Sequence, residues 1–582
     1  KRLRYPRSLM RNGHDPPKEF PPTICPLDPS GEIRMRFFPF LSFIALMLAC
    51  LPTNSAWLSA ADELPAVDRP LEEVVDTLID ARLAAAGVTA APGVDDAAFL
   101  RRATLDLAGR IPSAHEVETF LASADAGKRA IVVDRLLASP DFAYHLRNEY
   151  DVLLMAGKGN GEWREWLLRT VQEDRRWPQI FREVMLPHED QADLKAAAEF
   201  LKSRAANVDD MTNDTSRLFF GVSINCAKCH DHPLVPDWAQ DHYYGMASFF
   251  NRTYLTQKRF LAEREEGGLK FLTTAGAEKQ ARLIFLTRGE LAEPPPVVKT
   301  DEERKAAEAK QKADNEGATP PAPAAYSRRA RLVEVALDGG ADGFLARAFI
   351  NRLWARLFGA GLVTPLDQMH SENPPSHPEL LAWLARDAAT HDYDVRRLVR
   401  GLVLSRSYAR ASCWEQPGER PSDRLFAVAE VKPLSPMQLA LSLAIAVANP
   451  THLAQRQQGQ DSWAAQRRNL ENQAHGLASQ LEIPGEDFQV GVGEALLFSN
   501  GRRIEDEYLR DSGDRLVGAL KATGDPAQVV RQAFVSVLSR PPDAEETAWC
   551  EKYLADRADR PVAALRQLVW ALMTSSEFRF NN

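Results

Sequence analysis

Apolar residues recur at helical spacing along most of the chain, and this periodicity constrains the fold more than any other feature. Leu71, Val74, Val75, Leu78 and Ile79 follow one another at intervals that place them on one face of an α-helix. Comparable apolar runs cover residues 131–137, 344–358, 379–388, 398–404 and 436–448. We therefore predict a mostly α fold.

The middle of the chain has a different composition. It contains Glu293-Pro294-Pro295-Pro296, then a stretch rich in Lys, Glu and Ala, then Thr319-Pro320-Pro321-Ala322-Pro323. Such composition is typical of linkers, which are semi-rigid where proline dominates. We expect two helical domains, residues 62–255 and 328–582, joined by a linker or insertion at 256–327 with a small β element, for which residues 281–287 are the candidate strand.

Two further patterns lie within these helical regions. The segment Arg110 to Glu116 resembles Arg540 to Glu546, and each follows an apolar helix. Ser113 and Glu116 fit a capping box, which starts a helix. The similarity indicates either a duplicated helical unit or the convergence of short helical units on one pattern. Residues 455–485 are polar and rich in Gln, and we predict an insertion of low order there.

The N-terminal region predicts export. Met35 and Arg36 precede an apolar run over 37–51 and then Asn54-Ser55-Ala56, the anatomy of a secretory signal peptide. We assign 35–61 to this signal and 1–34 to an upstream extension; an N-terminal membrane anchor is the alternative. The protein is expected in the periplasm, outside the cell or on its surface, with no integral membrane span after signal cleavage.

Charge and motif content exclude several functional classes. The net charge of -9 argues against nucleic acid as a general partner, since that would favour a basic surface. Gly-x-Ser-x-Gly, His-Glu-x-x-His and a phosphate-binding glycine loop are all missing from the sequence. No catalytic residues are assigned, and whether the protein is an enzyme stays open.

One motif carries recognisable chemistry. Cys226-Ala227-Lys228-Cys229-His230 has the Cys-x-x-Cys-His pattern of c-type haem attachment, in which two thiols bind the porphyrin and the histidine binds iron. Of the six cysteines, only two others lie beyond the predicted signal, Cys413 and Cys550, and we expect both to be buried apolar residues.

The sixth iron ligand would have to come from elsewhere. Met246 is the first candidate, although it could equally be an ordinary core methionine, and His242 is the second. His232 lies too close to His230 to reach the opposite face of the ring. A vacant sixth position is also open. Tyr243, Tyr244, Phe249 and Phe250 could line a haem edge or belong to the core.

A non-haem metal is the rival interpretation of the same segment. Zinc prefers four sulfur or nitrogen ligands, and Cys226 and Cys229 could be joined by other nearby donors. These donors are His230, Asp231, His232 and His242. A local disulfide between the two cysteines is the remaining alternative.

Several ordered motifs resemble a known family: secreted planctomycete proteins that pair a cytochrome-motif domain of unknown function with a second planctomycete-specific domain of unknown function. In the first domain they are RRATLDLAG at 101–109, VDRLLASP at 133–140, CAKCHDHP at 226–233 and QDHYYGMASFF at 240–250. In the second they are ARAFINRLW at 346–354, NPPSHPELL at 373–381, WALM at 570–573 and Glu577-Phe578.

The resemblance implies an exported, c-type-cytochrome-like protein with one covalent haem c and a role in electron transfer with a redox partner protein. The family itself implies no proven reaction. The alternative is a scaffold or binding protein for cell-surface or polysaccharide partners, with zinc or another structural metal at the Cys/His cluster. A metal-dependent hydrolase at the Asp/His residues is a third hypothesis.

Overall fold

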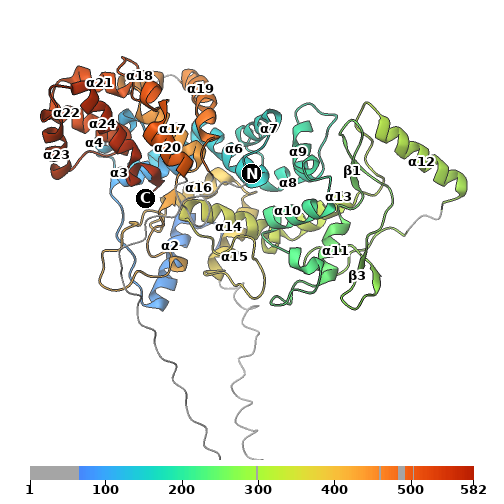
Figure 1. The fold of residues 1–582 in the computed structure, drawn as a ribbon. Helices are drawn as coiled ribbons and strands as arrows, with labels where there is room; N and C mark the ends of the chain where they lie inside the picture. Colours follow the sequence, from blue (N-terminus) through green and yellow to red (C-terminus); the bar gives the residue numbers. More distant parts are fainter. Residues whose placement is uncertain (1–63, 296–298, 458–459, 483–491, 503, 582) are drawn as a thin grey trace, which may run out of the picture. The chain divides into compact units, whose positions relative to one another are not determined.

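The computed structural model describes residues 64–295, 299–457, 460–482, 492–502 and 504–581 (Figure 1). The predicted upstream extension and signal peptide lie outside these residues. Within the described part, no helix has the length and apolarity that a membrane crossing requires.

The first helical region precedes the linker and is built mainly of helices, as predicted. Its α-helices are α2 (Leu71–Ala86), α3 (Asp96–Ala108), α4 (Ala114–Ala122), α5 (Lys128–Ala138), α6 (Pro140–Met155), α7 (Gly161–Gln172), α8 (Trp177–Met185), α9 (Glu199–Lys202), α10 (Val208–Phe220) and α11 (Gln240–Ser248). Two 3-10 turns accompany them, η2 (Lys195–Ala198) and η3 (Asn225–Lys228).

The small β element lies mainly in the linker region, and its first strand, β1 (Thr253–Leu255), comes from the last three residues of the predicted first domain. Two antiparallel hairpins form it, β1 with β2 (Leu261–Glu263) and β3 (Lys270–Leu272) with β4 (Glu278–Gln280). The strand predicted over 281–287 is wrong, because among those residues only Ile284 makes an isolated bridge, to Glu290. The charged stretch forms α12 (Asp301–Glu316), which buries none of its side chains.

The second helical region follows the linker. Its first helices are α13 (Arg328–Asp338), α14 (Phe344–Phe358), α15 (Pro378–Thr390), α16 (Val395–Leu404), α17 (Pro436–Ala446), α18 (Pro450–Gln457) and α19 (Gln460–Ala478), with η4 (Gly340–Asp342) and η5 (Asp423–Leu425) between them. The later ones are α20 (Val492–Asn500), the π-turn η6 (Ile504–Tyr508), α21 (Leu516–Thr523), α22 (Pro526–Leu538), α23 (Ala544–Ala555), α24 (Pro561–Thr574) and α25 (Ser576–Arg579). Strand β5 (Lys432–Pro433) pairs with β6 (Phe580–Asn581).

Local sequence explains many of these helix ends. Asp95 caps α3 by accepting a hydrogen bond from the amide of Ala98, and Gly109 ends the helix with a φ of 68°, a conformation that glycine adopts without strain. Ser113 and Glu116 form the predicted capping box at the start of α4. Such caps satisfy amides that a helix leaves without partners.

The two helical regions share their apolar core rather than folding apart. Residues 63–582 form one compact unit, and its largest core draws side chains from both regions. Trp177 of α8, for example, stacks on Phe349 of α14 with ring centroids 5.4 Å apart. A second core combines α17, α19, α21, α22 and α24 with Leu105 and Ile111 of the first region.

The prediction of a low-order insertion at 455–485 is wrong for its described part, because α19 packs against α6 and α17. Arg467 of α19 is fully buried and binds Asp141 at 2.8 Å and Glu471 at 2.5 Å. Trp463 donates a hydrogen bond to Asp141. The polar residues that resemble a solvated segment in the sequence are therefore paired with partners on a neighbouring helix.

The two similar segments adopt the same local structure. Arg110 binds Glu116 of its own capping box and Asp141 at the start of α6. Arg540 likewise binds Glu546 of the capping box of α23 and Glu577 at the start of α25. In each segment, one arginine binds the capping-box glutamate of the helix that follows it. The same arginine also binds an acidic residue at the start of a later helix.

The two remaining cysteines differ in their environment. Cys550 is buried, as predicted, whereas Cys413 is exposed. It lies in the irregular segment after α16. Both are free thiols, so the structure contains no bridge between them.

Candidate functional site

The Cys-x-x-Cys-His motif forms a short helical turn on the surface. Cys226 lies within η3, which follows α10, and Cys229 ends that turn. Residues three apart in a 3-10 helix lie over one another, so the turn brings both thiols to the same side. Both cysteines are free and exposed, while Ala227 between them is buried and fixes the turn to the core.

Helix α11 holds the backbone of this turn. The side-chain nitrogen of Gln240, Nε2, donates hydrogen bonds to the carbonyl oxygens of Cys229 at 3.1 Å and Lys228 at 3.4 Å. The side-chain oxygen of Gln240 accepts a hydrogen bond from the main-chain amide of Thr274. The Tyr244 hydroxyl also donates to the Lys228 carbonyl. These contacts join the motif, α11 and the β3–β4 hairpin, so the turn is supported from two elements.

Asp209 of α10 also binds the motif. Its carboxylate accepts hydrogen bonds from Lys228 and from the Tyr243 hydroxyl, each at 2.6 Å. Partial burial alone would raise the pKa of Asp209, but these two donors outweigh it and lower that pKa. The carboxylate therefore stays ionised and keeps its hold on Lys228 at neutral pH.

His230 is oriented in the way that a metal-binding imidazole requires. Its Nδ1 lies 2.7 Å from the carbonyl oxygen of Asp231. A carbonyl oxygen can only accept, so Nδ1 carries the proton of this bond, and in the neutral ring Nε2 keeps its lone pair. The ring is exposed. A histidine that donates one ring nitrogen to a carbonyl and offers the other is the usual arrangement around metals.

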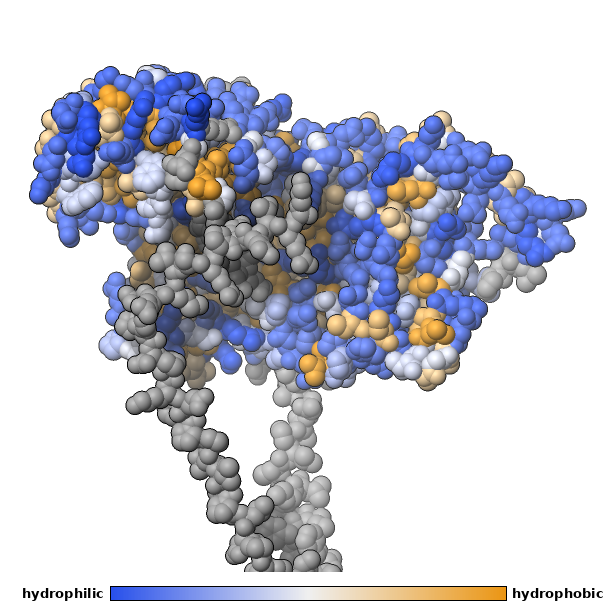
Figure 2. Space-filling model, viewed as in Figure 1, coloured by the Kyte–Doolittle hydropathy of each residue, from blue (hydrophilic) through white to orange (hydrophobic). Residues whose placement is uncertain are grey.

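The surface around the motif is apolar as well as accessible. Leu234 is 79 % exposed and Leu272 is 67 % exposed. Leu272 lies near the motif, because the side-chain nitrogen of Gln240 donates hydrogen bonds to the carbonyl oxygens of both Cys229 and Leu272. Figure 2 shows apolar surface in the region of α11 and β3. Two exposed thiols, an oriented imidazole and exposed apolar side chains together fit covalent haem.

The candidates for the sixth ligand lie in different environments. Met246 is completely buried and belongs to the main core. His242 is partly buried, and its Nδ1 accepts a hydrogen bond from the Ala239 amide. Of the aromatic residues, Tyr243, Phe249 and Phe250 are buried in the core, and only the Tyr244 ring is partly exposed, stacked on Phe271.

The candidate ligands of a non-haem metal are each engaged separately. The Asp231 carboxylate accepts from the Gln240 amide of the main chain, and His232 Nδ1 accepts from the Leu234 amide. His230 and His242 make the contacts described above. Among the described residues, no three or more Cys, His, Asp or Glu side chains gather as a metal site, so the structure does not bring this set together.

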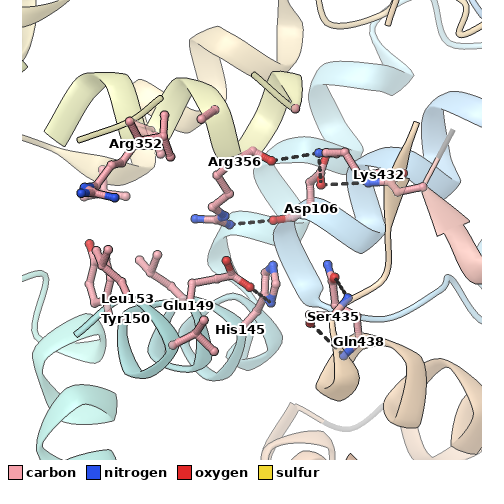
Figure 3. Close-up of a pocket in the computed structure, with 18 of the residues that line it drawn as sticks. Asp106, His145, Glu149, Tyr150, Leu153, Arg352, Arg356, Lys432, Ser435 and Gln438 are labelled. Atoms are coloured by element: carbon pink, nitrogen blue, oxygen red, sulfur yellow. Dashed lines mark hydrogen bonds and ion pairs between the residues drawn. The ribbon is translucent and has the colours of Figure 1, made fainter. Parts of the chain in front are cut away.

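Sequence reasoning missed a second feature, a cavity of about 650 Å³ between α6 and α14 (Figure 3). Its charged lining residues are Asp106, His145, Glu149, Arg352, Arg356 and Lys432. They come from α3, α6, α14 and β5, so no local pattern joins them. The one available signal was the pair Arg352 and Arg356, one turn apart on a mainly apolar helix.

Comparison with protein families identifies two domains in this chain. Residues 74–254 match a family model described as a protein of unknown function (DUF1549), and residues 328–483 match one described as a protein of unknown function (DUF1553). Both ranges lie within the two helical regions predicted from the sequence. No curated protein and no solved structure matches the chain. The chain thus pairs two domains of unknown function.

Proposed function

We propose that this chain is an exported c-type-cytochrome-like protein that carries one covalent haem and exchanges electrons with a redox partner. Cys226 and Cys229 would hold the haem through thioether bonds, and His230 would bind iron through Nε2. Haem supplies one-electron redox chemistry at its iron. The name of the first matched family model, PSCyt2, is consistent with a cytochrome.

The observation that carries the proposal is the state of His230. Its Nδ1–H donates to the Asp231 carbonyl, which fixes the tautomer and leaves Nε2 for a metal. Asp209, Gln240 and Tyr244 hold the surrounding turn. The proximal side of a haem site would therefore be organised before the cofactor arrives.

The burial of Met246 favours a vacant or exchangeable sixth position on a bound haem iron. Met246 is enclosed in the core, and a thioether there could reach an exposed iron only if α11 moved. Exposed Leu234 and Leu272 would cover part of the porphyrin or contact a partner. An open iron position adds binding of a small ligand to the redox chemistry that the site could support.

Export agrees with this chemistry, because bacterial c-type haem is attached outside the cytoplasm. The predicted signal peptide at 35–61 would provide the route. The second helical region would then serve as a docking module for the redox partner. A polysaccharide-associated scaffold with a structural metal is the competing proposal, and the experiment below separates the two.

The test is expression of the chain from about residue 60 in a host that matures c-type cytochromes, followed by a pyridine haemochrome spectrum. We expect a c-type spectrum that is lost in Cys226→Ala and Cys229→Ala. Cys413→Ala is the matched control, because Cys413 is also an exposed free thiol but lies outside the motif. A folded, colourless protein would overturn the proposal, and bound zinc in that protein would favour the scaffold.

A further inference from the structure

The cavity between α6 and α14 combines apolar walls with a charged end. Its walls include Leu146 and Leu153 of α6, Trp177 of α8, and Phe349 and Leu353 of α14. A volume of about 650 Å³ lies within the range of roughly 300–1,000 Å³ that is typical of small-molecule sites. No residue of the Cys-x-x-Cys-His motif lines it, so it is separate from the candidate haem site.

Two arginines at the charged end have no acidic partner. Arg352 and Arg356 lie one turn apart on α14, and each donates only to a main-chain carbonyl, of Arg217 and Asp106 respectively. Among the described residues, no carboxylate forms an ion pair within 4.0 Å of either guanidinium, although Asp367 acts on Arg352 from further away. The Nε atoms of both are buried without a hydrogen-bond partner, as is Nε1 of Trp177 in the same lining.

The acids of the cavity do not compensate this charge. The Asp106 carboxylate is saturated by Lys432 at 2.8 Å, Asn581 at 2.9 Å and the Tyr408 hydroxyl at 2.7 Å. Burial raises the pKa of Glu149, which favours its neutral form. Burial and neighbouring cations hold the pKa of His145 well below its usual range, so this ring stays neutral.

The lining of the cavity carries an excess of positive charge. Lys432 and Asp106 neutralise each other. Glu149 then lies opposite Arg356, as Figure 3 shows, while Asp367 acts on Arg352 without forming an ion pair with it. Buried charge without a partner is costly. An anion entering the cavity would compensate this charge.

We infer that this cavity binds a small organic carboxylate, with the carboxylate at Arg352 and Arg356 and an apolar body against Leu153, Trp177 and Phe349. Planar guanidiniums match the two oxygens of a carboxylate. The mainly apolar walls would give free inorganic phosphate nothing to contact, so the ligand is expected to carry a hydrophobic or aromatic portion.

Isothermal titration of the purified full chain tests this inference, with benzoate as the probe. Benzamide is the neutral analogue, and inorganic phosphate is the anion without an apolar body. We expect benzoate to bind at millimolar affinity or better, and both comparison compounds to bind at least ten-fold more weakly. Loss of a hydrogen bond to a charged group reduces affinity by about ten-fold to a hundred-fold, so Arg352→Met and Arg356→Met should each show that loss.

The control is Arg331→Met, since Arg331 is an exposed arginine on α13 that pairs with Glu334 outside the cavity. Arg352→Lys and Arg356→Lys keep the charge and should retain part of the affinity, which protects the test if a methionine variant does not fold. Equal binding of benzoate to the wild type and to the folded arginine variants would overturn the inference. So would an absence of benzoate binding, or stronger binding of phosphate. None of these outcomes depends on haem.

Discussion

The guanidinium of Arg110 lies 2.9 Å from the carboxylate of Asp141, and both side chains are almost completely buried. The same guanidinium binds Glu116 at 2.7 Å, and Asp141 also accepts hydrogen bonds from α19. One arginine therefore joins α4 and α6, and through Asp141 it is connected to the second helical region. Arg540 makes the corresponding contacts with Glu546 and Glu577, but nearer the surface.

Replacing the two arginines should have unequal effects on stability. Arg110→Met removes the guanidinium that binds two buried carboxylates, and only Asp141 keeps close buried partners, in Arg467 and Trp463. Breaking a buried ion pair in this way costs up to roughly 3–5 kcal/mol. Arg540 and its two acids are about 30 % exposed, so water replaces the lost contacts and Arg540→Met should cost about 1 kcal/mol. Urea unfolding measures both values. Equal losses would contradict the role of burial.

Stability should fall in acid because of Glu116. Burial alone would raise the pKa of this carboxyl, but Arg110 outweighs burial and lowers the pKa to about 2. The folded state therefore binds this proton less readily than the unfolded state. The stabilisation is present above the unfolded pKa of about 4.3 and is lost as the pH falls from there toward 2.

The contribution of Glu116 is at most on the order of 3 kcal/mol. Chemical unfolding at a series of pH values between about 6 and 3 measures the slope. Glu116→Gln should be less stable at pH 6 and should lose part of the acid dependence. A variant with the wild-type slope would show that other carboxyl groups govern acid unfolding.

Gln240→Leu should impair the candidate haem site without touching its thiols. The variant leaves the Lys228 and Cys229 carbonyls and the Thr274 amide without this partner, at a cost of about 1–3 kcal/mol. We expect less haem per protein, measured by pyridine haemochrome against total protein. Gln280→Leu serves as the control, since Gln280 is exposed on β4. Equal haem content in both variants would contradict a positioning role for Gln240.

Met246→Leu distinguishes a core methionine from an iron ligand. As a volume-conserving change in the core it should cost less than about 1.5 kcal/mol, and the visible spectrum of the haem-loaded protein should not change. Met246→Ala should cost about 2–5 kcal/mol because it leaves a cavity. A spectral change in Met246→Leu at unaltered stability would show instead that the thioether reaches iron.

Binding of an anion in the α6–α14 cavity should be coupled to protonation of Glu149. This carboxyl faces His145 on its own helix, Arg356 on α14, Asp106 on α3 and Lys432 on β5, and burial is the main cause of its raised pKa. A bound carboxylate adds negative charge and raises that pKa further, so benzoate should bind with proton uptake, and affinity should fall as the pH rises.

Titrations in two buffers with different ionisation heats measure this uptake over a pH series that starts near the ordinary carboxyl pKa of about 4.3 and extends upward. Glu149→Gln should bind benzoate at least as tightly as the wild type and without the coupled proton. The same uptake in the variant would assign the proton to another group.

The sequence predicted the helices well because their signals are local. Residues 344–358 were expected to be helical from their apolar spacing and form α14 within the same bounds. The Ser113 and Glu116 cap was readable from two residues. The polar stretch that became α19 was misjudged, because its amphipathic pattern is masked by Arg467 and Glu471, which are buried only because Asp141 and Arg147 lie opposite them.

The sequence alone determined the helical class, the caps and the Cys226, Cys229 and His230 motif, since each depends on residues within a few positions of one another. Only the tertiary structure decided that Met246 is enclosed, that Cys413 is exposed, and that Arg356 lies beside the Asp106 carbonyl 250 residues earlier in the chain. Packing brings such distant residues together, and burial then sets their charge and reactivity, which no local pattern contains.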